Sequence, residues 1–491
     1  MIQTHSESNI LCKTLRSARG AVGGGCVAMT QWPLMARIGA AGLFVAICLL
    51  PAMAQAPAAA ASAATPEPVT VFTSHPRLFL RPARLRLLRR ERERTSARWQ
   101  QFDAYVAGGA PMPETGFAQA LYYLISGDAG AGRRAVAWAL GPGNDLRQLA
   151  LVFDWCQDLL SENDRQALAA RISAAMVQTA ADDTIPAVRS RVLAAIALFD
   201  HVERIPNQEL DRVVHDWWQG RITPAIKAGM PVIRRDDAYA LWEMLHAIRD
   251  STNLDLRESA PGFFREFPIE HLMSYYPAGF PGEDNDYRVG ATDHPGKPDL
   301  VQASLSRAAE LAMVSYDSNA ESSQYLQGWL MHDNFMLRDT FGAPYEFLWA
   351  NPYQPGLSFT DVPLVFHDAR FGQLFVRSDW EDSADWFGYF DGVAQFFHDG
   401  QVSQISLASA GSLDLGTAII HSGRAARFDV NLRDPHQAVI LVGLVPRRVY
   451  QVEIDDEEVS EQASDAGGIL VLQVPPGKPV GVRIREARAS Q

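Results

Sequence analysis

The spacing of apolar residues changes part-way along the chain. From about 75 to 355, apolar positions recur every three or four residues, which is typical of amphipathic helices. From about 361 to 491 they alternate or form short runs between turn residues, which is typical of strands. The turn-rich stretch Asn351-Pro-Tyr-Gln-Pro-Gly356 separates the two patterns. The sequence therefore predicts a multidomain α+β protein, with a helical domain over 75–355 and a short β-sandwich over 361–491.

The helical period predicts consecutive helices joined by short loops. Because amphipathic helices in this number must stack or close to bury their apolar faces, we expect an (α/α) toroid with a cleft at its open end. Ser161 is expected to cap one helix, with Asp164 near the third helical position. The predicted helices are 83–107, 115–126, 129–139, 145–160, 162–181, 186–202, 208–228, 236–250, 263–275, 299–316 and 322–340.

The second half contains no helical pattern between its strands. Without crossover helices, an antiparallel β-sandwich is favoured over a parallel sheet. Pro363 restricts the first strand to a sheet edge, because proline donates no ladder hydrogen bond. The predicted strands are 362–366, 373–377, 386–391, 402–408, 438–444, 449–454, 469–473 and 480–484.

The N-terminal region has the organisation of a targeting segment. Arg37 precedes an apolar run over 38–50, and small residues follow up to Ala56. We interpret 1–56 as a signal peptide whose start is assigned too far upstream, and 57–74 as an Ala/Pro-rich linker. The run is shorter than the roughly 20 residues of a membrane span, although an uncleaved anchor is the alternative. The expected location is periplasmic or secreted, with no stable membrane span after cleavage.

Charge and cysteine content narrow the classes of partner. The formal net charge is −13, which argues against nucleic acid as a ligand. An acidic polysaccharide remains compatible if a groove is locally basic. Beyond the leader, Cys156 is the remaining cysteine and lies in an apolar helix, so we expect a core thiol and no disulfide framework.

The helix predicted over 236–250 carries chemistry along one stripe. A helical projection places Tyr239, Glu243 and His246 in one narrow sector, with Trp242 beside them. Arg235 could bring positive charge to the start of this helix. The stripe is either an ordinary solvated face or a functional one.

The β half offers a candidate metal site. His398, Asp414 and His436 are residue types that ligate zinc, and neighbouring strands can bring them together. Spacing alone is weak support for such a site.

Several segments together resemble the heparinase II/III-like polysaccharide lyases. The likeness spans nearly the whole chain beyond the leader. It implies an (α/α) toroid followed by an antiparallel β-sandwich, and cleavage of uronate-containing glycans by β-elimination. It also implies a structural zinc on His398, Asp414 and His436, with no cofactor for catalysis. The segments are His75-Pro-Arg-Leu-Phe-Leu-Arg-Pro, Asp154-Trp155, Arg377-Ser-Asp-Trp380, His398-Asp-Gly-Gln and Asp434-Pro-His436.

The chemistry of β-elimination suggests roles for the candidate residues. The uronate carboxylate must be neutralised, a base must remove the C5 proton, and an acid must protonate the departing O4. By its position in the helix order, Tyr239 resembles the family's catalytic tyrosine, and a nearby cation would lower its pKa. Arg235 and His246 are further catalytic candidates. The expected substrate-binding residues are Arg189, Trp242, Tyr275, Tyr276 and Arg377.

Two departures from the family keep other functions open. The family places an Asn-His pair where this chain reads Asp182-Asp-Thr-Ile-Pro-Ala-Val-Arg-Ser-Arg191, and the β half is short. One alternative is a catalytically inactive glycan-binding relative. Another is a glycoside hydrolase on the same toroid, which needs two carboxylates. Its candidates are Glu243 with Glu283, Asp284 or Asp286.

Overall fold

The computed structural model describes residues 68–283, 285–291, 298–333, 335–408, 411–422, 427–456 and 458–487. The predicted signal peptide and most of the linker lie outside these ranges, and so does Asp284. Within the described ranges, no helix is both long enough and apolar enough to span a bilayer.

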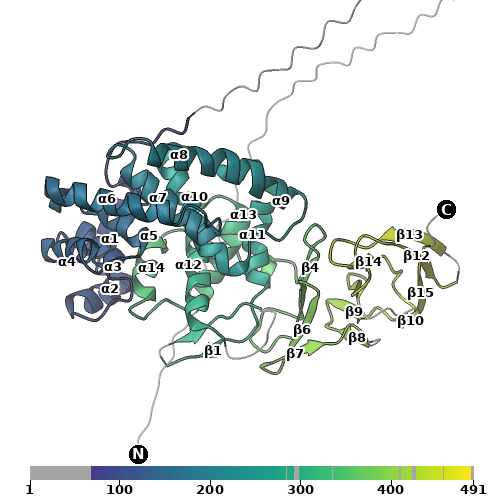
Figure 1. Cartoon of the computed structure of the whole chain (residues 1–491). Coiled ribbons are helices and arrows are strands. Elements are labelled where there is room, and N and C mark those ends of the chain that lie inside the picture. Colours follow the sequence, from purple (N-terminus) through teal and green to yellow (C-terminus); the bar gives the residue numbers. More distant parts are fainter. Residues whose placement is uncertain are drawn as a thin grey trace, which may run out of the picture. The chain divides into compact units, whose positions relative to one another are not determined.

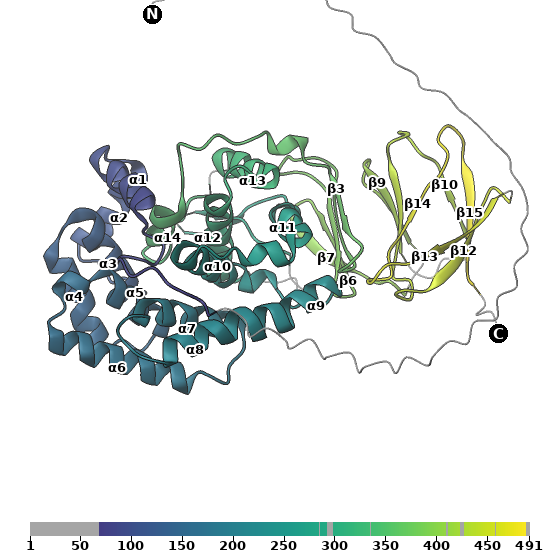
Figure 2. The same cartoon turned by 90° about the horizontal axis from the view of Figure 1, so that it is seen from above.

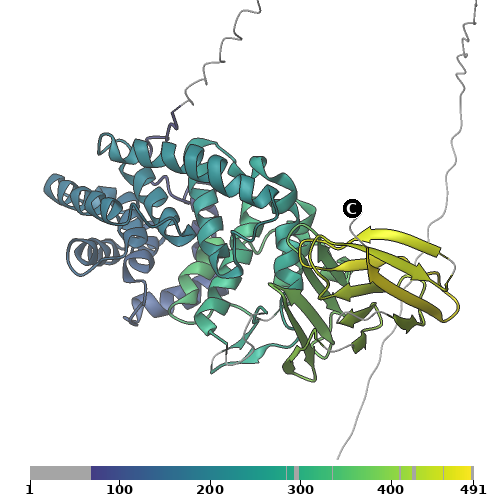
Figure 3. The ribbon, with the colours of Figure 1, turned by 45° about the vertical axis from the view of Figure 1, so that its right-hand side comes forward.

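Helices occupy the first part of the described chain and strands the second, as the change of period predicts (Figures 1 and 3). The α-helices are α1 (Pro82–Glu93), α2 (Ala97–Ala107), α3 (Thr115–Ser126), α4 (Ala129–Leu140), α5 (Leu146–Trp155), α6 (Glu162–Gln178), α7 (Ile185–Leu198), α8 (Ile205–Asp211), α9 (Thr223–Lys227), α10 (Ala238–Thr252), α11 (Pro261–Met273), α12 (Leu300–Tyr316), α13 (Glu321–His332) and α14 (Gly342–Trp349).

Local signals explain where several helices begin and end. Ser161 caps α6 by accepting the backbone N–H of Asp164 at 3.2 Å, as predicted. The single helix predicted over 83–107 is instead split at Thr95, whose φ of 48° ends α1, and Ser96 caps α2. A π-helical stretch, Arg212–Ile222, joins α8 to α9 into one continuous rod (Figure 1).

Six largely buried helices contact one another in a cycle. Contacts run from α3 to α5, α7, α10, α12 and α14, and α14 contacts α2 and α3. One continuous hydrophobic core joins these helices, and α10 is buried over nearly its whole length. The helices of this cycle are therefore covered by other side chains on both their inner and outer faces. The toroid stays a prediction that this cycle of contacts supports.

The described residues of the β half form three sheets. Their strand orders are β3-β4-β5-β6-β7, β14-β11-β9-β8 and β10-β15-β12-β13. The strands are β3 (Val365–Asp368), β4 (Gln373–Arg377), β5 (Trp386–Phe390), β6 (Val393–His398), β7 (Gln401–Ile405), β8 (Gly411–Asp414), β9 (Ala418–Ser422), β10 (Arg427–Val430), β11 (Ala438–Val442), β12 (Val449–Ile454), β13 (Glu458–Ala463), β14 (Leu470–Leu472) and β15 (Val480–Glu486). A small hairpin, β1 (Phe280–Pro281) with β2 (Asp286–Tyr287), lies within the helical half.

The middle sheet explains the apolar run at 438–442. Val439 and Leu441 of β11 face one core, and Ile440 and Val442 face another. In Figure 2, strands β9 and β14 of this sheet lie between β3 of the first sheet and β15 of the outer sheet. A strand buried on both faces reads as a continuous apolar segment. The predicted β-sandwich is confirmed in outline, since sheets pack face to face, and the described strands add a third sheet to it.

Antiparallel pairing is confirmed for the described strands of the β half, with one exception. β9 and β11 pair in parallel, from Ala418 with Ala438 to Ser422 with Val442. The intervening strand β10 leaves for the outer sheet and pairs with β15, so the chain returns to the middle sheet in the same direction. By contrast, β3 follows Pro363 and is an edge strand, as predicted.

Candidate functional site

Tyr239 lies in a buried polar cluster built from several helices. We call Glu114, Arg147, Arg189, Tyr239 and Glu243, with Tyr345 and Trp349, the Glu243 cluster. Glu114 precedes α3, Arg147 lies in the first turn of α5, and Tyr239 lies in the first turn of α10. Helix N-termini carry partial positive charge, so this end of the helices favours anionic groups.

Glu243 is the centre of this cluster. Its carboxylate accepts hydrogen bonds from Arg147 at 2.8 Å and from Arg189 at 2.5 Å. Burial alone would raise the pKa of Glu243, but the two guanidinium groups outweigh burial and lower it below its ordinary value. Glu243 is therefore an ionised carboxylate at neutral pH. This counts against its use as the protonated acid of a glycoside hydrolase.

The Tyr239 hydroxyl has partners on three sides. It donates to Glu243 Oε1 at 2.9 Å and accepts from Trp349 Nε1 at 3.1 Å, and Arg147 Nη2 lies 3.4 Å away. Burial and the Glu243 carboxylate raise the pKa of Tyr239 well above its ordinary value, although Arg147 opposes them. Arg147 does act to lower this pKa, as expected of a nearby cation, but burial and the Glu243 carboxylate outweigh it, so the net shift is upward. The phenol keeps its proton at neutral pH, so it can act as an acid but not as a base.

Only the rim of the Glu243 cluster reaches solvent. The side chains of Glu114 and Arg189 are 24% and 13% exposed, whereas Arg147 is 2% and Glu243 is 0% exposed. Glu114 accepts from Arg147 at 3.0 Å and from the Tyr345 hydroxyl at 2.6 Å. A ligand would therefore meet Arg189 and Glu114 first. The interpretation of the Tyr239 stripe as a solvated helix face is wrong.

Arg235 lies in a second buried cluster. Its guanidinium donates to the carbonyl of His271 at 2.8 Å and lies 4.2 Å from the centre of the Tyr275 ring. Its Nε and Nη2 atoms have no hydrogen-bond partner among the described groups. Nearby, Arg307 pairs with Glu310 at 3.1 Å. The structure thus separates Arg235 from the Glu243 cluster, although the two positions are close in sequence.

His246 lies further along α10 than Tyr239, and it is buried among other side chains. Its Nε2 lies 2.9 Å from the carbonyl of Ala312, and its ring packs against Trp349 and Tyr316. Burial lowers the pKa of His246 well below its ordinary value, so the ring is neutral. Trp349 separates this ring from Tyr239, since it contacts both. The structure gives His246 a packing role, and its catalytic role stays a prediction without support.

The residues predicted to stack on sugars are covered. Trp242 is 1% exposed and Tyr275 is 1% exposed, both within packed aromatic groups. Tyr276 stacks on Phe397 and donates to Gln395 Oε1 at 2.6 Å. Arg377 donates to the carbonyl of Tyr275 and supports the backbone there. None of these four side chains offers an open face, so their substrate roles also stay predictions.

The predicted zinc ligands are not gathered at one point. His398 is an exposed residue bonded to Asp385 at 2.6 Å, and Asp414 accepts from Gln437 at 2.7 Å. His436 is exposed in the loop before β11. Among the described residues, the ligand atoms of these three side chains do not all lie within 4.8 Å of one another. The structural zinc stays a prediction.

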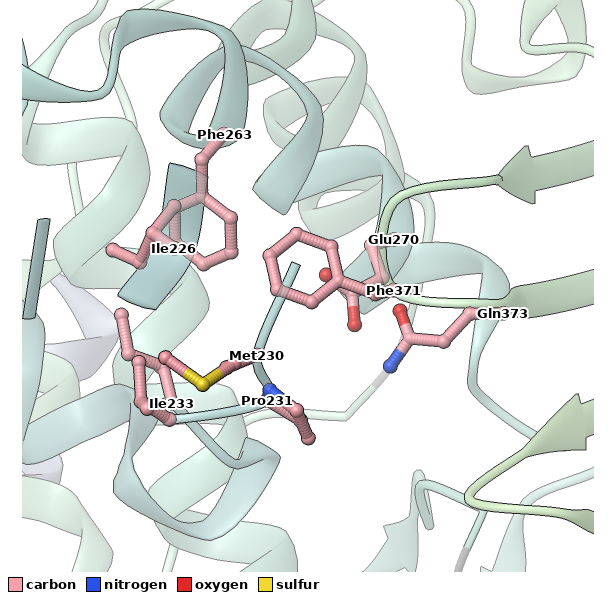
Figure 4. Close-up of a pocket in the computed structure, with 9 residues that line it drawn as sticks. Ile226, Met230, Pro231, Ile233, Phe263, Glu270, Phe371 and Gln373 are labelled. Atoms are coloured by element: carbon pink, nitrogen blue, oxygen red, sulfur yellow. The ribbon is translucent and has the colours of Figure 1, made fainter. Parts of the chain in front are cut away.

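A small pocket not anticipated from the sequence lies beside α11 (Figure 4). Its lining is mostly apolar, including Met230, Phe263 and Phe371, but Glu270 and Gln373 also face it. Burial raises the pKa of Glu270 to about 7, and Asp368 adds to the shift while Arg235 opposes it. Glu270 is therefore a carboxyl group that titrates near neutral pH.

Sequence reasoning missed most partners of Tyr239. Arg147 is the one basic residue in the largely apolar helix Leu146–Trp155, which is a signal that its side chain has a buried partner. No comparable signal identified Glu114 or Trp349. Glu270 and His75 were also missed as titratable groups of interest.

The comparisons with known proteins are sparse. The chain matches no protein-family model and no curated protein. One solved structure to which it is similar is a glycoside hydrolase, with a TM-score of 0.29, 9% sequence identity, and coverage of 85% of this chain and 77% of that chain. A likeness at this TM-score supports no inference about fold or activity.

Proposed function

We propose that this protein is an exported carbohydrate-active protein that cleaves uronate-containing glycans by β-elimination, with its site at the Glu243 cluster. The observation that carries the proposal is the convergence of a phenol with two guanidinium groups, Arg147 and Arg189, at helix N-termini. The resemblance to heparinase II/III-like lyases in the sequence supports the same reaction class. Arginine is well suited to bind a sugar carboxylate because its planar group bonds both oxygens.

In this proposal Tyr239 is the general acid. The carboxylate of Glu114, at the rim of the cluster, is the base in this proposal: it takes the C5 proton, the C4–C5 double bond forms as the C4–O4 bond breaks, and the phenol gives its proton to O4. The raised pKa keeps Tyr239 protonated, which is the state that an acid requires, and excludes the base role. Arg147 and the Trp349 N–H lie beside the hydroxyl, where they would stabilise the phenolate left after transfer.

The test measures unsaturated product. The full-length protein is incubated with alginate, heparin, chondroitin and hyaluronan, and the conjugated double bond is followed by ultraviolet absorbance. Tyr239→Phe should lower the rate at least about 100-fold, the contribution typical of a general acid. Tyr353→Phe is the matched control, because that ring is 46% exposed. Reducing sugar without unsaturated product would favour hydrolysis and contradict the proposal.

A second candidate is a glycan-binding protein without catalysis. It is favoured by the 4% exposure of Tyr239, whose hydroxyl is fully hydrogen bonded inside the protein. In that case no glycan is cleaved, but one binds in isothermal titration. Arg189→Gln should then weaken binding about tenfold, whereas Arg221→Gln, whose side chain is 65% exposed, should not. Equal affinity of both variants would contradict binding at this cluster.

A further inference from the structure

Three potential metal ligands meet at the junction between the N-terminal segment and the end of α7. The ligand atoms of His75, Asp200 and His201 all lie within 4.8 Å of one another. His75 lies before α1, whereas Asp200 and His201 follow α7. This group lies apart from the Glu243 cluster and from the predicted zinc ligands of the β half.

A buried carboxylate fixes the orientation of His75. Its Nδ1 lies 2.5 Å from Asp154 Oδ1, and the backbone N–H groups of Arg77 and Leu78 also bond Asp154. Asp154 is 1% exposed. A carboxylate on Nδ1 holds the proton there and leaves Nε2 without one, as a metal ligand requires, an arrangement that recurs at metal-binding histidines.

The spacing of the two imidazoles matches a tetrahedral metal centre. His75 Nε2 and His201 Nε2 are 3.3 Å apart. Two nitrogens that each lie about 2.0–2.1 Å from a tetrahedral zinc ion are themselves about 3.3 Å apart. Asp200 Oδ1 lies 3.5 Å from His201 Nε2, so the carboxylate is placed as a third ligand.

We propose that His75, His201 and Asp200 form a binding site for a divalent transition metal, with zinc as the ion that best fits two imidazoles and one carboxylate. The three side chains are 17%, 23% and 34% exposed, so an ion can reach them from solvent. A surface pocket lined by Asp200, His201 and Glu203 leaves room for a water molecule as fourth ligand. The carbonyl end of α7 adds partial negative charge beside the site.

Arg77 is the competitor for this site. Its Nη2 lies 2.7 Å from Asp200 Oδ1, 2.8 Å from His75 Nε2 and 2.8 Å from the carbonyl of Thr73. One amino group has two hydrogens, so it cannot serve all three acceptors at once. Metal binding requires Nη2 to give up His75 and Asp200. Two bonds would still hold Arg77 in place with the metal bound. Nη2 donates to the carbonyl of Thr73, and Nη1 donates to the carbonyl of Ile196 at 3.0 Å.

The experiment titrates the full-length, metal-free protein with zinc chloride and, separately, with cobalt chloride. We expect one zinc ion per chain and an increase in melting temperature with zinc concentration. Cobalt should give the visible absorption bands of a tetrahedral centre. His201→Ala and Asp200→Asn should each weaken zinc binding more than tenfold and remove these bands.

The controls separate this site from the other histidines. His398→Ala and His436→Ala remove the ligands predicted in the β half, and both should retain the zinc affinity of the unmodified protein. Circular dichroism checks folding, and Asp200→Asn provides a second, milder variant if His201→Ala does not fold. Absence of zinc binding, unchanged affinity in both His201→Ala and Asp200→Asn, or loss of binding in His398→Ala would overturn the proposal.

Discussion

At the scale of single residues, the surroundings shift the pKa values of two neighbouring side chains in opposite directions. Tyr239 and Glu243 lie four residues apart on α10, yet burial raises the pKa of the phenol while two arginines lower that of the carboxyl. The charge of Arg147 is central, because it contacts Glu243, Glu114 and Tyr239. Removing one partner of a buried ion network leaves another charge without compensation.

Arg147→Met should lower the free energy of unfolding by about 3–5 kcal/mol, because Glu243 then keeps only Arg189 as a cationic partner. Guanidinium denaturation measures the change. Arg133→Met on the exposed face of α4 is the control, and it should change stability by less than about 0.5 kcal/mol. A loss below about 1 kcal/mol in Arg147→Met would show that Glu243 is compensated in another way.

At the scale of elements, a single carboxylate ties the entry segment to α5. Asp154, near the end of α5, accepts the backbone N–H groups of Arg77 and Leu78 at 3.0 and 2.9 Å. Trp155 donates from its indole to the carbonyl of Leu78 at 3.0 Å. The segment around Leu78 has no regular secondary structure, so these bonds satisfy backbone groups that would otherwise be buried without partners.

Asp154→Asn should destabilise the protein by about 1.5–3 kcal/mol, because hydrogen bonds to a charged acceptor become weaker bonds to an amide. Hydrogen exchange should show faster exchange at the amides of Arg77 and Leu78 than in the unmodified protein. Asp158→Asn, at an exposed position after α5, is the matched control and should leave both quantities unchanged. Unchanged protection of the two amides would contradict the anchoring role of Asp154.

At the scale of the whole molecule, α11 connects the helical core to the first sheet. Trp386 of β5 donates to the carbonyl of Met273 at 2.8 Å, and aromatic residues from both parts form one packed cluster. Glu270 lies at this contact, in the pocket that also includes Gln373 of β4 (Figure 4). A carboxyl group whose pKa is about 7 in the folded state is protonated there more readily than in the unfolded chain.

Stability should therefore depend on pH through Glu270. The contribution of protonated Glu270 to the free energy of unfolding is fully present below the ordinary carboxyl pKa of about 4.3. It is lost as pH rises through about 7. The loss should not exceed about 3 kcal/mol, since solvent reaches part of the carboxyl group. Thermal unfolding between these pH values measures it. In Glu270→Gln this part of the pH dependence should disappear, whereas in Glu266→Gln, at an exposed position on the same helix, it should remain.

Local pattern by itself determined the change from helices to strands and most of the helices, but strands β6, β8, β9, β10 and β13 and helix α14 were not predicted. The change of apolar period located the transition from helices to strands, Ser161 was identified as a cap, and Cys156 was expected in the core, where it is buried. These features depend on neighbours within one helical turn or one strand. The projection of α10 also singled out Tyr239 and Glu243, which do lie together.

Tertiary structure alone decided what surrounds those residues. Arg147 and Trp349 lie 92 and 110 positions from Tyr239 in sequence, and no local period encodes contacts at such separations. The burial of Tyr239, the separation of Arg235 from it, and the parallel pairing of β9 with β11 follow from packing between distant segments. Charge and hydrogen-bonding partners set the chemistry of a side chain, so its identity is local while its reactivity depends on the fold.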